Sequence, residues 1–360
     1  MKLKIAKFAV IAVALSCATM LGQTVTSSLV GSVVDPTDAV VAGAPVTLTS
    51  VDTGAVWTGK TDNLGTYRFV NLEPGTYNVT IKATGFKSEV QTGIVVVAQE
   101  THNAGKLTLQ VGSVGDSVTV TAEAAQVQLD SGEKSQTVDS KDLEDLTLKG
   151  RDLFGYMRLV PGVIDTAASR DVTSHGAISG ININGATSAL NFTVDGVTDM
   201  DTGSNTSLQY EPNLDAIQEL KVLTSNYAAE FGRNSGGTIT VVTKNGTREF
   251  HGTAAWNHRH EEFNADTWVN DHTIKNGEAT PRVPYRYNIE TYSLGGPVFI
   301  PKHWNTNKKR VFFFVSQEWV GQFVTGGSVS QYTPTALERA GNFTQSFNNN
   351  GSLILSLIHI

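Results

Sequence analysis

Between residues 24 and 112, apolar side chains alternate with polar ones, and this period of two constrains the fold more than any other feature. Valine and leucine alternate with threonine in residues 46–49, and aromatic and aliphatic residues alternate with polar ones in residues 77–83. A period of two places one face of each strand in a core and the other face in water. Turn sequences separate these runs at residues 62–65 and 73–75. The region is therefore predicted to be a small antiparallel β-sandwich.

The first 23 residues are expected to be a secretory signal peptide. Three lysines precede an unbroken apolar run over residues 8–15, and small residues follow it. The run is too short for a membrane helix, which needs about 20 apolar residues. Cys17 is the single cysteine and lies here, so a disulfide framework or a cysteine-based metal site is excluded. A lipoprotein site at Cys17 is the weaker alternative, because the residues before it fit that pattern poorly.

The composition favours packed domains and argues against nucleic acid as a partner. The 360 residues carry a formal net charge of −7, and 40% of them are hydrophobic. This hydrophobic fraction is enough for packed cores, and a net negative chain offers no basic surface to a phosphate backbone. A chain of this length is expected to hold two or three domains, since a domain has roughly 150 residues.

Four stretches of the N-terminal region resemble the carboxypeptidase regulatory-like domain: residues 30–35, 43–48, 61–69 and 72–77. The resemblance implies a transthyretin-like sandwich over residues 24–112, of a kind grouped with carbohydrate-binding-like folds. It implies no peptidase activity, because the zinc-dependent catalytic domain is a separate unit. A sugar-binding platform needs paired exposed aromatic residues; Trp57 is the obvious candidate here, and a lone tryptophan is expected in the core.

Residues 113–245 form a mixed α+β region. A helix is predicted from Asp139 or Ser140 to a stop at Gly150, and a second from residue 151 to 159, before a Pro-Gly pair. Asp195 and Gly196 follow a strand-like run and mark a hairpin, where the turn explains the aspartate better than a catalytic role does.

Three glycines near the end of this region, Gly232, Gly236 and Gly237, are spaced for tight turns and close backbone approach. Such turns suit a small domain wedged inside a narrow lumen. The alternative is an ordinary α+β domain with a glycine-rich bend. A phosphate-binding loop is disfavoured, because the Gly-x-Gly-x-x-Gly spacing is absent after a strand.

Residues 191–197, 217–223 and 236–244 resemble the plug domain of TonB-dependent outer-membrane receptors, as do Tyr227 and residues 230–232 between them. The resemblance implies an α+β plug over residues 113–245. Thr224, Ser225 and Asn226 stand where the common pattern carries Arg-Gly-Pro. Together with the sandwich, this departure resembles the Oar-like subset, so a siderophore-type substrate is not implied.

Aromatic residues concentrate after residue 245, where 17 of the 29 in the chain are found. Residues 285–290 alternate before Gly295 and Gly296 interrupt the pattern, and an apolar run over residues 311–315 follows a basic loop. Strands of this kind suit the wall of a transmembrane β-barrel, predicted over residues 246–352 in contact with outer-membrane lipid. They also resemble the first barrel strands of Oar-like receptors. The alternative is a soluble β-domain with an aromatic core.

The barrel is expected to be incomplete. Receptors of this kind close with about 22 strands, which at roughly 10 residues each exceeds the residues that remain. Since an open sheet edge is costly in hydrocarbon, the chain is expected to be an N-terminal fragment. Residues 353–360 depart from the family pattern and are expected to be a non-native tail, with a truncated strand as the alternative.

No enzymatic chemistry is predicted, and neither a cofactor nor a metal is expected. The densest cluster of potential metal ligands comprises His251, His258, His260, Glu261 and Glu262, and its spacing is not that of a His-Glu-x-x-His motif. A solvated strand end and loop is the expected role. The sequence has no Gly-x-Ser-x-Gly motif, and the single cysteine is in the signal segment, so no nucleophile is recognisable.

The resemblance implies a mainly β importer in the cell outer membrane. An unknown peptide, glycan or small molecule binds its outward-facing loops, and TonB, energised through ExbB and ExbD, pulls on the plug. The contact with TonB is hypothesised to be an extended strand that alternates in polarity: Asp116, Ser117, Val118, Thr119, Val120, Thr121 and Ala122. A last sandwich strand or a plain linker is the alternative for this segment. The rival function is an exported adhesion or carbohydrate-binding protein without transport.

Overall fold

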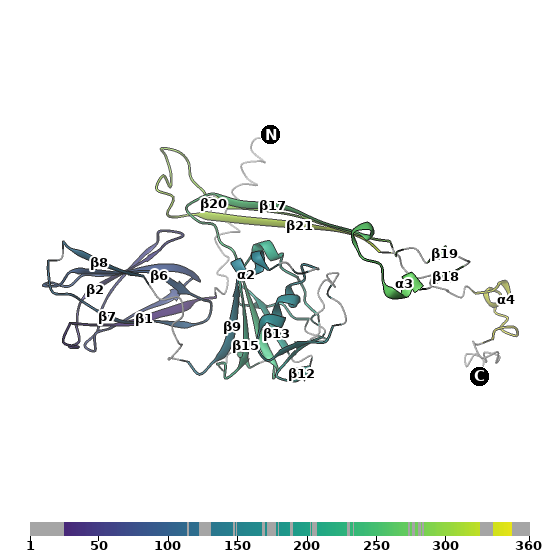
Figure 1. Cartoon of the computed structure of the whole chain (residues 1–360), viewed down its shortest axis with the longest axis horizontal. Coiled ribbons are helices and arrows are strands. Elements are labelled where there is room, and N and C mark those ends of the chain that lie inside the picture. The colour runs from purple at the N-terminus through teal and green to yellow at the C-terminus, as the bar shows by residue number, and fades with distance from the viewer. Residues whose placement is uncertain are drawn as a thin grey trace. The chain divides into compact units, whose positions relative to one another are not determined.

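The computed structural model describes most of the chain from Val25 onward (Figure 1). The described residues are 25–113, 115–121, 131–146, 148, 150–167, 170, 178, 180–187, 190–201, 203, 207–228, 231–232, 234–272, 274–275, 278–279, 282, 284–324 and 334–347. The expected signal peptide and C-terminal tail lie outside them. The chain divides into two compact units: Met1–Ala255 with Glu290–Trp319, and Trp256–Ile289 with Val320–Ile360. Over the described residues, no helix is long and apolar enough to cross a membrane.

The N-terminal region folds as a sandwich of two sheets, with strand orders β4-β1-β7 and β3-β2-β5-β6-β8. The strands are β1 (Ser27–Val34), β2 (Pro45–Ser50), β3 (Val56–Lys60), β4 (Thr66–Leu72), β5 (Gly75–Ile81), β6 (Ser88–Val96), β7 (Thr101–Thr108) and β8 (Ser117–Thr121). Two pairs, β1 with β7 and β6 with β8, are parallel. The prediction of an antiparallel sandwich is wrong for these pairs. Each of these connections passes through strands of the other sheet, so the chain returns in its earlier direction.

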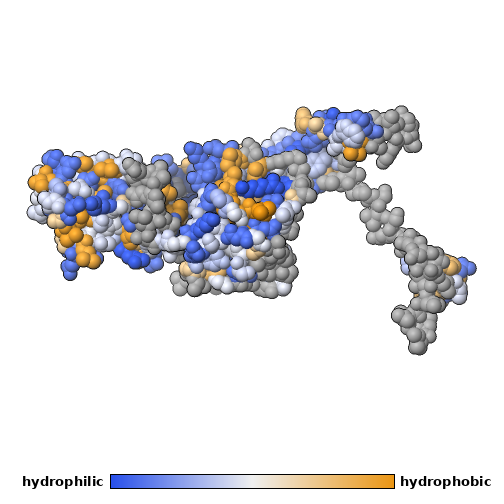
Figure 2. Space-filling view, turned by 60° about the horizontal axis from the view of Figure 1, so that its bottom comes forward, coloured by the Kyte–Doolittle hydropathy of each residue, from blue (hydrophilic) through white to orange (hydrophobic). Residues whose placement is uncertain are grey.

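The core of the sandwich follows the alternation of the sequence. Leu48 and Val79 are fully buried in one apolar cluster, whereas their polar neighbours face outward. Burying a side chain of this size contributes roughly 1.5–3 kcal/mol. Trp57 is half-buried against this core and meets Tyr77 edge to face, with ring centroids 5.8 Å apart. On the surface seen in Figure 2, hydrophobic residues are interspersed with hydrophilic ones.

The region predicted to be a plug, residues 113–245, is built on a five-stranded sheet in the order β14-β13-β16-β15-β9 and a small sheet in the order β10-β11-β12. Its strands are β9 (Lys134–Asp139), β10 (Val163–Asp165), β11 (Ile181–Ile183), β12 (Ala186–Thr187), β13 (Leu190–Val194), β14 (Val197–Thr198), β15 (Ile217–Ser225) and β16 (Gly237–Thr243). Its helices are α2 (Ser140–Asp145), η1 (Leu153–Leu159) and η2 (Leu214–Ala216). Apolar side chains from the large sheet and from these helices form one core.

The first helix of the plug was predicted better at its start than at its end, and the second was predicted better at its end. Asp139 caps α2 by accepting a hydrogen bond from the Asp142 N–H at 2.8 Å. The helix ends at Asp145 because Leu146 is extended, so the predicted stop at Gly150 is wrong. The second predicted helix forms as the 3-10 helix η1, which Asp152 caps.

The region after residue 245 contains a three-stranded sheet in the order β17-β20-β21. Its strands are β17 (His251–His260), β20 (Tyr285–Pro297) and β21 (Phe312–Val324). The smaller elements are η4 (Glu261–Phe263), α3 (Trp268–His272), β18 (Ile274–Lys275), β19 (Glu278–Ala279) and α4 (Ala336–Arg339).

Strand β20 continues through Gly295 and Gly296, so the predicted interruption there is wrong. A Cβ at Gly295 would meet the ring of His251, and a Cβ at Gly296 would meet the ring of Phe250. These rings cover the glycines from the neighbouring segment, which allows the strand to remain regular.

The two faces of β20 differ in polarity within Glu290–Trp319. Thr291 and Ser293 are buried, and the Thr253 and Ser293 hydroxyls are 2.8 Å apart. Tyr292 and Trp319 are exposed on their strands, with ring centroids 5.4 Å apart. An apolar outer face backed by a polar face is typical of a strand in a transmembrane barrel wall.

Candidate functional site

Asp195 and Gly196 form the two-residue turn between β13 and β14. Their φ angles are 49° and 82°, and Val194 pairs with Val197 across the turn. Two residues with positive φ are typical of a type I′ hairpin, and an Asp-Gly sequence favours this turn. The hairpin predicted from this dipeptide therefore forms.

The Asp195 side chain fastens this turn to the end of β16. Its carboxylate accepts hydrogen bonds from the Thr243 N–H at 2.9 Å and from the Thr243 Oγ1 at 2.8 Å. The Asp195 N–H donates to the Val241 carbonyl at 2.9 Å. Both carboxylate oxygens of Asp195 are therefore used in holding Thr243.

The three glycines lie in different surroundings. Gly237 begins β16 in a crowded position, where a Cβ would lie 2.9 Å from the Cδ1 of Ile183 and 3.0 Å from the carbonyl oxygen of Leu223. Gly236 is buried beside it, and Gly232 is exposed in a turn. The close backbone approach expected of these glycines is therefore found at Gly237.

A buried ionic cluster lies in the plug, where the long segment between β10 and β11 begins. Arg170 Nε donates to Asp165 at 2.7 Å, and Arg170 also lies 3.6 Å from the Asp152 carboxylate. Burial alone would raise the pKa of Asp165, but hydrogen bonds from Arg170 and the Ala167 N–H hold it below its ordinary value. The cluster anchors the start of this segment, of which residues 171–177 lie outside the described part of the chain.

A second buried polar cluster, which the sequence analysis missed, centres on Lys221 in β15. Lys221 is 1% exposed, and its ammonium group donates to the carbonyls of Ala98 and Gln99 at 3.1 and 3.2 Å. It also lies 2.9 Å from the Oε1 of Glu133. Glu219, two residues earlier on β15, accepts the Ala98 N–H at 2.6 Å.

Two carboxyl groups in and near this cluster have raised pKa values. Burial raises the pKa of Glu219 to about 7, against the opposing effects of the Ala98 N–H and Lys221. Burial also raises the pKa of Glu100. The cluster had a signal in the sequence, since the charged residues Glu219 and Lys221 are two apart and flank the apolar Leu220.

The proposed TonB contact is an edge strand of the sandwich. Strand β8 pairs in parallel with β6, from Ser88 opposite Ser117 to Thr92 opposite Thr121, and it is last in the order of its sheet. Val120 is 42% exposed. Ala122, the last residue of the hypothesised contact, lies outside the described residues.

The histidine-rich segment does not converge on one point. The His258 and His260 rings are 5.9 Å apart, and the Nδ1 of His258 lies 2.7 Å from the Oδ1 of Asn288. His260 lies 3.5 Å from the Glu261 carboxylate. Among the residues that the structure describes, no group of three or more metal-binding side chains is found.

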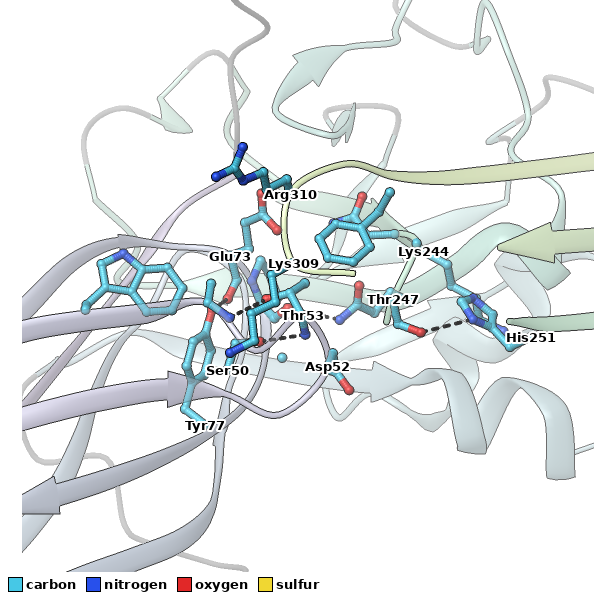
Figure 3. A pocket seen from close by; sticks show the side chains of 18 of the residues that line it. Ser50, Asp52, Thr53, Glu73, Tyr77, Lys244, Thr247, His251, Lys309 and Arg310 are labelled. Carbon is cyan, nitrogen blue, oxygen red and sulfur yellow. Dashed lines mark hydrogen bonds between the residues drawn. The ribbon is translucent and has the colours of Figure 1, made fainter. Parts of the chain in front are cut away.

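A hollow of about 530 Å³ lies within the first compact unit (Figure 3). Figure 3 shows Ser50, Glu73 and Tyr77 from the sandwich together with Lys244, Thr247 and His251 from the chain after β16. The Tyr77 hydroxyl donates to the Glu73 carbonyl at 2.6 Å. Both signs of charge line this hollow, so its lining does not select one class of ligand.

Three family models match the chain in succession. The carboxypeptidase regulatory-like domain matches residues 28–110, the TonB-dependent receptor plug domain matches residues 127–239, and an outer membrane β-barrel domain matches residues 242–357. In this order the chain carries a plug domain and a barrel domain like those of the TonB-dependent outer-membrane receptors. The resemblances found in the sequence and the mainly β fold class are thereby confirmed. The boundaries at residues 24–112, 113–245 and 246–352 stay predictions.

A relative and two solved structures are similar to this receptor. The TonB-dependent transporter Oar of Myxococcus xanthus is 26% identical over 291 residues, which cover 77% of this chain and 26% of the relative. The siderophore receptor PirA from Acinetobacter baumannii is 19% identical, with a TM-score of 0.33, over 52% of this chain and 24% of PirA. The outer membrane transporter YddB from Escherichia coli is 17% identical, with a TM-score of 0.33, over 46% of this chain and 24% of YddB. The receptor chain spans about a quarter of the length of the curated relative.

Proposed function

We propose that this receptor imports a ligand across the outer membrane through a β-barrel that its plug closes. TonB, energised by ExbB and ExbD, supplies the pull that opens the path. The successive matches to a plug and an outer membrane β-barrel support both the transport role and the outer-membrane location. The receptor acts in this proposal without catalysis or a cofactor.

The observation that carries the proposal is the position of the first plug strand. β9 lies at the edge of the five-stranded sheet, and among the described strands it pairs with β15 alone, from Lys134 opposite Ser225 to Asp139 opposite Glu219. An edge strand is held on one side only, so it separates at a lower cost than a central strand. A pull on the chain that precedes β9 therefore acts on the part of the plug sheet that separates first.

The TonB contact is proposed at Asp116, Ser117, Val118, Thr119, Val120, Thr121 and Ala122. Strand β8 has one edge paired with β6, and among the described strands none pairs with its other edge. A strand of TonB can add to this edge through backbone hydrogen bonds. Val118 and Val120 lie on one face of β8, since alternate residues share a face.

The ligand is not assigned to a chemical class. The ionic cluster of Asp152, Asp165 and Arg170 supports a rigid base for one outward-facing plug segment. The plug turns at Asp195, Gly196, Gly232, Gly236 and Gly237 are proposed to shape the rest of the domain.

The proposed contact is tested with the purified periplasmic domain of the host TonB and the detergent-solubilised receptor. Val118→Pro removes a backbone N–H from β8, and Val118→Ala is the matched control that keeps it. We expect Val118→Pro to weaken TonB binding by about tenfold and Val118→Ala to leave it nearly unchanged. Equal binding by both variants and the native chain would show that TonB does not use this strand.

Transport itself is tested in cells that express the complete gene. Deletion of residues 116–122 is expected to abolish TonB-dependent uptake of added nutrients and to leave surface binding intact. Uptake that is the same with and without TonB would overturn the transport proposal. It would favour the rival role of an exported adhesion or carbohydrate-binding protein.

A further inference from the structure

Lys221 joins the plug sheet to two places that are far apart in the chain. Its ammonium group contacts the carbonyls of Ala98 and Gln99, between β6 and β7, and the carboxylate of Glu133, directly before β9. Two of its three donors bond the carbonyls, and the contact with Glu133 is an ion pair. At 1% exposure, Lys221 has no aqueous alternative for them.

The two places lie on either side of the proposed TonB contact. The chain leaves Lys221 at Gln99, passes through β7 and β8, and returns to Lys221 at Glu133. Both ends of this segment are thus held by one side chain of β15. Strand β8 lies inside the segment.

The hold on residues 98–99 is reinforced by neighbouring side chains. Glu219 accepts the Ala98 N–H at 2.6 Å, and the Oγ1 of Thr240 donates to the Oε1 of Gln99 at 3.1 Å. Ala98 also packs with Val242 and Val25 in a small apolar cluster. Strands β15 and β16, two of the three inner strands of the sheet, therefore hold this turn.

We infer that Lys221 is a positioning residue that carries a pull on residues 100–132 into β15, inside the plug sheet. Without the Lys221 contacts, such a pull reaches the plug through the backbone into edge strand β9 and through the weaker hold of neighbouring side chains on residues 98–99. With the Lys221 contacts, the same pull also exerts force on β15 from both ends of the segment. The source of the pull rests on the proposed function, whereas the route of the force rests on these contacts alone.

The test is a single-molecule pulling experiment on the complete receptor in lipid. A handle is attached at Ser117→Cys, and the force at which the plug first extends is recorded. Lys221→Met keeps the bulk of the side chain and removes its charge. The matched control is Lys106→Met, which removes the exposed ion pair of Lys106 with Asp38, 3.0 Å long.

We expect Lys221→Met to lower the first rupture force of the plug by about half, because a buried pair that loses one partner is strongly destabilised. Lys106→Met is expected to leave that force unchanged, since exposed pairs contribute little. A rupture force for Lys221→Met equal to that of the native chain would overturn the inference.

A second variant keeps Lys221 and covers the case in which Lys221→Met does not fold. Ala98→Cys with Val242→Cys places two thiols in the small apolar cluster, here with a peptide-tag handle in place of the cysteine at 117. When oxidised, this pair is expected to raise the first rupture force, and reduction is expected to restore the native value. Identical forces before and after reduction would show that residues 98–99 do not carry the pull.

The two proposals fail separately in these experiments. The handle replaces TonB, so a receptor that does not bind the periplasmic domain of TonB overturns the proposed function and leaves the Lys221 result intact. A receptor that binds TonB but shows no effect of Lys221→Met overturns the further inference alone.

Discussion

The carboxylate of Asp195 accepts two hydrogen bonds from Thr243, one from the backbone N–H at 2.9 Å and one from Oγ1 at 2.8 Å. The two residues are 48 positions apart: Asp195 directly follows β13, and Thr243 ends β16, which pairs with β13 in parallel. The turn after β13 is therefore locked to the C-terminal end of β16, the last strand of the plug sheet.

Replacing this carboxylate is expected to loosen the turn. Asp195→Asn leaves one carbonyl oxygen for two donors, so about 1–2 kcal/mol of local stability is lost. Hydrogen exchange of the β13–β14 hairpin in detergent is expected to accelerate accordingly. Asp38→Asn, at an exposed position on the sandwich, is the control, and equal exchange in both variants would contradict the role of Asp195.

Gly237 is expected to tolerate no side chain. In Gly237→Ala the added Cβ would press on Ile183 and on the backbone oxygen of Leu223, at a φ of +157°. Overpacking of this kind costs roughly 1–3 kcal/mol. Limited proteolysis of the folded receptor is expected to cut the plug faster in this variant. Gly132→Ala, where a Cβ meets nothing within 4 Å, is expected to be cut at the native rate.

Glu219 is expected to make the plug less stable as the pH rises. Its pKa is about 7 in the folded chain and 4.5 when solvated, so the folded state holds a proton that the unfolded state releases. The sign follows from linkage: the stabilising effect of this proton is full below pH 4.5 and is lost as the pH rises through 7. The free energy of unfolding is expected to fall by about 3 kcal/mol over this pH range.

Glu219→Gln removes this titration and keeps an acceptor for the Ala98 N–H. The variant and the native receptor are expected to melt similarly at pH 5, and the variant is expected to be more stable at pH 8. The difference between the two melting curves isolates Glu219 from other titrating groups. A difference that does not change with pH would show that Glu219 is ionised throughout.

The exposed face of β21 is expected to require an apolar residue at position 319. Trp319 is 54% exposed beside Tyr292, on the face proposed to meet lipid. An arginine on a lipid-facing position costs roughly 2–4 kcal/mol at mid-membrane, so Trp319→Arg is expected to lower the amount of folded receptor in the outer membrane. Trp319→Phe keeps an apolar ring and is the control. Equal amounts of both variants would place this face away from lipid.

Local chemistry explains which elements could be predicted. The strands of the sandwich follow from alternation, and the turn at Asp195 and Gly196 follows from the positive φ angles that this dipeptide adopts readily. The end of α2 at Asp145 and the continuation of β20 through Gly295 were not predictable in this way. Both depend on neighbours that the local sequence does not contain, such as the ring of His251 over Gly295.

By itself the sequence determined the strands, the main turns, the family and the order of its domains, because alternation, turn residues and family motifs act over a few neighbouring positions. Only the tertiary structure decided that β7 pairs in parallel with β1 and β8 with β6, and that Ala98 and Glu133 meet at Lys221. The reason is physical: a buried ammonium group must find acceptors wherever packing brings them, and the Ala98 carbonyl is 123 positions away in the chain.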